Sequence, residues 1–111
     1  MSKISEARKI LADVPVENAF YFNTAVDAFT GRCAQNLVSF RDHLKNVDIK
    51  SVQFHMSRGD FEKWVHFLGD NVLAIQISRL SKRGLTGENL RSRLYDAVNT
   101  RINELKGISK I

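Results

Sequence analysis

Apolar side chains recur at intervals of three and four residues along most of this chain, and single glycines interrupt the pattern. The pattern is clearest where Phe61, Trp64, Val65 and Leu68 follow at i, i+3, i+4 and i+7. This spacing puts the four side chains on one face of an α-helix. With 111 residues, 43% of them apolar, the chain can bury such faces in one core. The sequence therefore predicts a mainly α, compact multi-helix fold as a single domain over residues 1–111.

Six segments carry the helical pattern, and they lie near residues 4–14, 37–47, 49–58, 61–68, 73–80 and 87–107. A residue that can cap a helix N-terminus precedes each of the last five: Asn36, Asp48, Asp60, Asp70 and Thr86. Gly59 and Gly69 suit the left-handed position at which helices end. A helix, a Gly-Asp pair and a second helix therefore occur twice in succession.

Residues 20–33 differ from the rest of the chain. Phe20-Tyr21-Phe22 and Phe29-Thr30 are short aromatic and β-branched runs, and Asp27 between them suits a turn. This pattern predicts a short β-hairpin near residues 20–33, with Gly31 at a bulge or a strand end.

The first helix, expected over residues 1–15, has a narrow apolar stripe of Ile4, Ala7, Leu11 and Val14, and Pro15 should end it. Such a stripe can dock on the domain or pair with a second copy of the chain. Docking within the chain is the favoured interpretation. A homo-oligomer formed through residues 4–14 is the alternative.

Cys33 is the only cysteine, so the fold cannot depend on a disulfide, and a reducing compartment is expected, with the cytoplasm as default. The first 15 residues mix charged and apolar side chains, unlike a signal peptide. The longest apolar run, over residues 72–75, is far too short to span a membrane. We therefore expect no membrane association.

The positive charge is concentrated in residues 79–111, where eight basic residues stand against three acidic ones and account for the whole excess of five. The candidates for contact with phosphates are Arg79, Lys82, Arg83, Arg91, Arg93 and Arg101. The apolar spacing predicts that Arg91, Arg101 and Lys106 face solvent. A solvated helix face explains the same charge. Tyr95 is the only aromatic residue in this segment, so base stacking has little support.

One cluster has varied chemistry, and it consists of His55, Arg58, Asp60 and Trp64 at the expected corner between two helices. A histidine beside a carboxylate can transfer protons, and the four side chains can contact a protein partner. A purely structural role ranks first, because no nucleophile accompanies the cluster. The histidine spacing and the single thiol do not suit zinc. We expect no catalytic, cofactor or metal site, and so no enzyme.

The stretch from Phe54 to Trp64 reads FHMSRGDFEKW and continues with Leu68-Gly69-Asp70. This FHxxRGDFxxW core, together with Phe20-Tyr21-Phe22 and Thr30-Gly31, resembles a family of small uncharacterised proteins, mainly archaeal. The resemblance covers residues 19–106 and leaves the opening helix outside. It implies a helical cytoplasmic module and no assigned activity.

Two functions remain for such a chain. The first is a small non-enzymatic interaction module that binds another protein through residues 55–64 or through the N-terminal stripe. The alternative is a nucleic-acid-binding protein that uses the basic C-terminal helical face.

Overall fold

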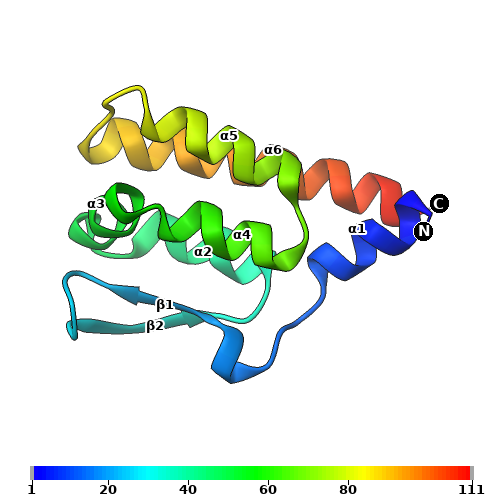
Figure 1. Ribbon diagram of the computed structural model, residues 1–111, viewed down its shortest axis with the longest axis horizontal. Coiled ribbons are helices and arrows are strands. Elements are labelled where there is room, and N and C mark those ends of the chain that lie inside the picture. Colours follow the sequence, from blue (N-terminus) through cyan, green and yellow to red (C-terminus); the bar gives the residue numbers. More distant parts are fainter. Residues whose placement is uncertain (1, 111) are drawn as a thin grey trace.

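A computed structural model describes residues 2–110 and confirms the mainly helical fold with one small hairpin. The elements in chain order are α1 (Lys3–Leu11), η1 (Val16–Asn18), β1 (Phe20–Asn23), β2 (Phe29–Ala34), α2 (Leu37–Asn46), α3 (Ile49–Arg58), α4 (Asp60–Leu68), α5 (Asn71–Ser81) and α6 (Gly87–Ser109). Figure 1 shows α5 and α6 along one side, the hairpin along the other, and α2, α3 and α4 between them.

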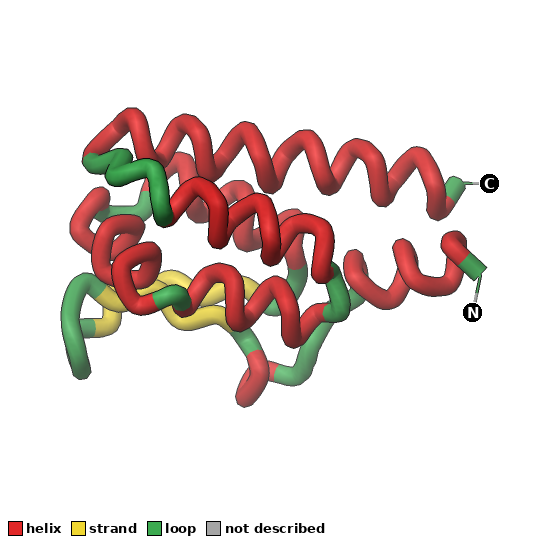
Figure 2. The backbone as a smooth tube through the Cα atoms, turned by 45° about the horizontal axis from the view of Figure 1, so that its top comes forward, coloured by secondary structure: helices red, strands yellow, loops and turns green. Residues whose placement is uncertain are grey.

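The long helix α6 is the element against which most others pack. It contacts α1, α2, α3 and α5, and both views place α1 beside its C-terminal part (Figures 1 and 2). One side chain enters the core at each turn of α6: Leu90, Leu94, Val98, Ile102 and Leu105. This spacing is the apolar period of the sequence, so the pattern of residues 87–107 predicted the buried face correctly.

The hairpin pairs β1 and β2 antiparallel and contains the expected bulge. Phe22 lies opposite Arg32, whereas the next residue of β1, Asn23, lies opposite Phe29. Two residues of β2 are therefore unpaired in the ladder, and one of them, Gly31, has a φ of +87° that a glycine adopts without strain. Alternation along β1 buries Phe20 and Phe22 and exposes Tyr21.

Phe20 joins this hairpin to the helices. Its ring centroid lies 4.7 Å from that of His55 on α3, 5.4 Å from that of Phe40 on α2, and 5.2 and 5.7 Å from those of Phe61 and Trp64 on α4. Separations of this size and the tilted or edge-on geometry are typical of favourable aromatic packing. One strand residue thus connects three helices.

The N-terminal helix α1 packs against α6 of the same chain, which was the favoured expectation for its apolar stripe. Ala7 and Ile10 are buried, and the Arg8 guanidinium donates to the Ser109 carbonyl over 3.3 Å. The helix is shorter than expected, because the backbone becomes extended at Ala12, three residues before Pro15. Ile10, which the predicted stripe did not include, is buried beside Ala7, whereas Leu11 is only partly buried.

The two Gly-Asp pairs end helices in the same way and begin them differently. Gly59 and Gly69 both adopt the left-handed conformation that ends a helix. Asp70 then caps α5 as predicted, since its Oδ1 accepts the Leu73 N–H over 3.1 Å. The prediction that Asp60 caps α4 was wrong: Gly59 alone separates α3 from α4, so Asp60 already lies in the first turn and makes no capping bond.

The hydrogen bond that caps the N-terminus of α6 also differs from the prediction. Thr86 occupies the N-cap position, but its side chain makes no capping bond. The Gly87 N–H instead donates to Oε1 of Gln53 on α3, over 2.8 Å. A side chain from a neighbouring helix therefore replaces the local cap, and it also ties α3 to α6.

A buried ion pair fixes α6 to the start of α5. Asp70 is only 1% exposed, and its Oδ2 accepts the Arg101 Nε–H over 2.8 Å. Burial by itself would lower the pKa of Arg101, but the hydrogen bond and charge of Asp70 raise it above its ordinary value. Both oxygens of Asp70 are thus engaged, one with the backbone of α5 and one with the guanidinium of α6.

We expect Asp70→Ala to lower the free energy of unfolding by about 3 kcal/mol, because it removes a helix cap and leaves a largely buried guanidinium without its main partner. The control is Glu104→Ala, which removes the second carboxylate of Arg101, an exposed group 3.5 Å away. That loss should be about 0.5 kcal/mol or less. Urea denaturation followed by circular dichroism measures both, and equal losses would contradict the assigned role of Asp70.

Candidate functional site

The corner between α3 and α4 is organised around His55. This side chain is 4% exposed and lies against the rings of Phe20 and Phe61. The backbone N–H of Asn23 donates to its Nε2 over 2.9 Å, so Nε2 is an acceptor and the ring proton is on Nδ1. Nδ1 donates to Oδ2 of Asp60, 2.8 Å away. His55 therefore links β1, α3 and α4 as a neutral imidazole.

Burial lowers the pKa of His55 below its ordinary value of 6.5, and the positive charge of Arg58 acts in the same direction. The hydrogen bond and charge of Asp60 oppose this effect without cancelling it. Since Nε2 already accepts a hydrogen bond from the backbone, protonating it would break the link to Asn23. The arrangement holds the hairpin in place, and it offers no free lone pair on His55 for a substrate.

The other three residues of the predicted cluster are brought together only in part. Oδ2 of Asp60 accepts the hydrogen bond from His55 Nδ1 and lies 3.3 Å from Arg58 Nε. The Trp64 indole is buried and donates to the Asn18 carbonyl over 2.9 Å. Arg58 alone is largely exposed, with its guanidinium 4.9 Å from the centroid of the Phe54 ring. The surface that this corner presents to a partner is therefore mainly Arg58.

The six predicted phosphate-contacting residues do not form one face. The expectation that Arg91 and Arg101 face solvent was wrong, because their side chains are 15% and 14% exposed. Arg91 donates to the Leu44 carbonyl of α2 over 2.7 Å, and Arg101 pairs with Asp70. Lys82 is exposed at the end of α5. The remaining three, Arg79, Arg83 and Arg93, line a groove between α5 and α6.

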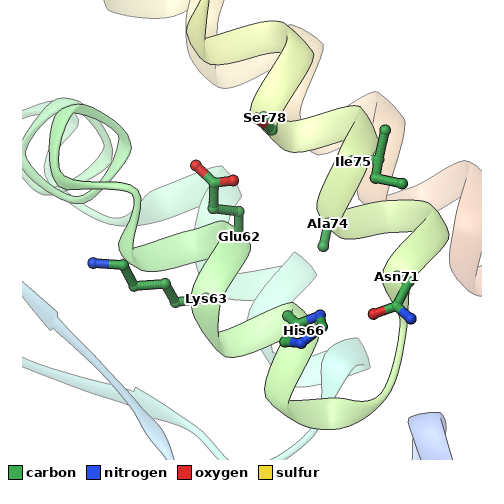
Figure 3. Close-up of a pocket in the computed structure, with 7 residues that line it drawn as sticks. All are labelled: Glu62, Lys63, His66, Asn71, Ala74, Ile75 and Ser78. Carbon is green, nitrogen blue, oxygen red and sulfur yellow. The ribbon is translucent and has the colours of Figure 1, made fainter.

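A larger groove of about 660 Å³ lies between α4 and α5. Figure 3 shows Glu62, Lys63 and His66 on its α4 side, and Ala74 and Ile75 on its α5 side. Opposite charges are adjacent on its rim, so its electrostatics favour neither an anion nor a cation. Nothing in its lining selects one class of ligand.

A third surface, on the outer side of the hairpin, was not predicted from the sequence. We define the hairpin face as the exposed side chains of Tyr21 and Phe29. The Tyr21 and Phe29 ring centroids are 5.8 Å apart, and the Tyr21 hydroxyl donates to the Val16 carbonyl over 2.6 Å. The alternation of β1 could have revealed this face, because burying Phe20 and Phe22 turns Tyr21 outward.

The lowered pKa of His55 predicts that the chain loses stability in mild acid. Below about pH 6.5 the unfolded chain takes up a proton that the folded chain resists, so the free energy of unfolding falls until the pH reaches the pKa of the folded state. His55→Gln should flatten this decline. His66→Gln, at an exposed position on α4, should keep the wild-type slope. Urea denaturation across this pH range measures the slopes, and an unchanged slope in His55→Gln would contradict the role assigned to His55.

Among residues 2–110, no helix is both long and apolar enough to cross a membrane. Within the same range, no group of three or more histidine, cysteine, aspartate or glutamate side chains is placed to hold a metal ion.

Comparison with known proteins gives one match, to a family model. No curated protein and no solved structure matches the chain. The model of a family of unknown function (DUF5752) matches residues 1–99. The matched range includes α1, which the resemblance noted in the sequence had left outside. The chain therefore belongs to the DUF5752 family, a family of unknown function.

Proposed function

We propose that the chain is a non-enzymatic, cytoplasmic protein-binding module and that the hairpin face is its contact surface. The observation that carries the proposal is the exposed aromatic pair of Tyr21 and Phe29, held together on the outer side of a rigid hairpin. Aromatic side chains are enriched at protein interfaces and often supply most of the binding energy.

The hairpin is held in one conformation, which favours binding. Thr30 Oγ1 donates to the Phe22 carbonyl over 2.7 Å, and the Asn23 N–H donates to His55. Phe20 anchors the opposite side of the sheet in the aromatic core. A surface that is already ordered loses little conformational entropy when a partner binds.

The chemistry of the α3–α4 corner supports a non-enzymatic role. Both nitrogens of His55 and the carboxylate of Asp60 are engaged within the fold. The single thiol, Cys33, is partly buried in β2, where it suits a reducing compartment such as the cytoplasm. The nucleic-acid alternative has weaker support, since Arg91 and Arg101 are committed to contacts inside the fold.

A photoreactive phenylalanine analogue at position 29 tests the contact surface in the natural host. We expect one discrete cross-linked protein adduct, absent when the same analogue replaces Ile75. The two positions are matched, because Phe29 is 55% and Ile75 53% exposed.

The cross-linked protein is then purified and titrated against variants of the chain. Phe29→Ser should weaken its binding about ten-fold or more, since ten-fold corresponds to about 1.4 kcal/mol and removing a hot-spot side chain costs about 2 kcal/mol or more. Ile75→Ser should bind as the wild type does. If no adduct forms at position 29, or if both variants bind like the wild type, the proposal is wrong.

A further inference from the structure

The groove between α5 and α6 combines an apolar floor with a positively charged rim. Its volume is about 450 Å³. Leu80 and Ala97, both partly buried against the core, contribute the apolar surface. Arg79 lies on α5, Arg83 in the turn that follows it, and Arg93 on α6. Asp96 also lines the groove, so three arginines stand against one carboxylate and the rim is positive on balance, whereas the α4–α5 groove has one glutamate and one lysine.

The three arginines differ from most others in the chain in lacking a carboxylate partner. Four arginines form ion pairs with aspartate or glutamate: Arg41, Arg58, Arg91 and Arg101. Within residues 2–110, no ion pair involves Arg79, Arg83 or Arg93. Arg8 and Arg32 form no such ion pair either, but they lie apart from one another and outside the groove, whereas Arg79, Arg83 and Arg93 line it together.

We propose that this groove binds an acidic amphipathic helix of a protein partner. A groove between two packed helices accepts the side-chain ridge of a third helix. Apolar side chains of the incoming helix would rest on Leu80 and Ala97, and carboxylates beside them would meet the guanidinium groups. Arginine favours such contacts, because its planar fork matches a carboxylate with two hydrogen bonds.

The same observations disfavour nucleic acid as the occupant. The only aromatic residue nearby in the sequence, Tyr95, faces α2, where its ring lies 5.4 Å from Lys45 Nζ. Three arginines can neutralise only a few phosphates, whereas an apolar floor contributes nothing to binding a duplex backbone.

A labelled model peptide tests the groove on the intact chain by fluorescence anisotropy. The peptide has about 15 residues, roughly four helical turns, with leucines three and four positions apart and glutamates beside them. We expect saturable binding that Arg79→Glu/Arg83→Glu weakens about ten-fold or more, since two attractions become repulsions. Lys50→Glu/Lys63→Glu is the matched control, because it changes the net charge equally at exposed positions outside the groove. Its affinity should stay close to that of the wild type.

Three results would overturn the proposal. The first is no saturable binding of the acidic peptide to a folded wild-type chain. The second is equal weakening by the groove and control variants, or equal binding of a peptide with glutamine in place of glutamate. The third is tighter binding of duplex DNA that only the groove variant abolishes, which would assign the groove to nucleic acid. The hairpin face takes no part in this experiment, so failure here leaves the proposed function standing.

Discussion

The packing of Phe20 against His55, Phe40, Phe61 and Trp64 is the contact on which the rest of the structure depends. A two-stranded hairpin is at best marginally stable by itself in water, so it needs a helical surface to fold against. Phe20 supplies that contact from the strand side, while α2, α3 and α4 supply it from the helix side. Because β1 alternates, the same contact that buries Phe20 turns Tyr21 outward and creates the hairpin face.

Of the three buried polar side chains within residues 2–110, two join segments that are far apart in the sequence. His55 connects the hairpin to the α3–α4 corner as a neutral ring, and Asp70 connects α5 to α6 as the main ion-pair partner of Arg101. Burial imposes the difference: an imidazole can lose its proton to avoid the cost of desolvation, whereas a guanidinium cannot and requires a carboxylate.

Local sequence predicts much of the fold, but it predicts fewer of the contacts that build the candidate site. Helix positions, the bulge at Gly31 and the helix ends at Gly59 and Gly69 depend on period and backbone conformation, which neighbouring residues determine. The role of Asp60 does not follow from local sequence. Only Gly59 separates α3 from α4, so Asp60 lies inside α4 and bonds to His55 instead of capping the helix. The burial of Arg91 and Arg101 depends on how α6 lies against α2 and α5, which no spacing within α6 encodes.

The elements that carry the two proposed surfaces lie on opposite sides of the molecule, with the hairpin along one side and α5 and α6 along the other (Figure 1). They share no residue, and the layer of α2, α3 and α4 separates them. Their chemistry also differs, since the hairpin face is aromatic and uncharged whereas the α5–α6 groove carries three unpaired arginines. Occupying one surface would leave the other accessible. The two proposals are therefore compatible, and together they would have one domain contact two different proteins at once.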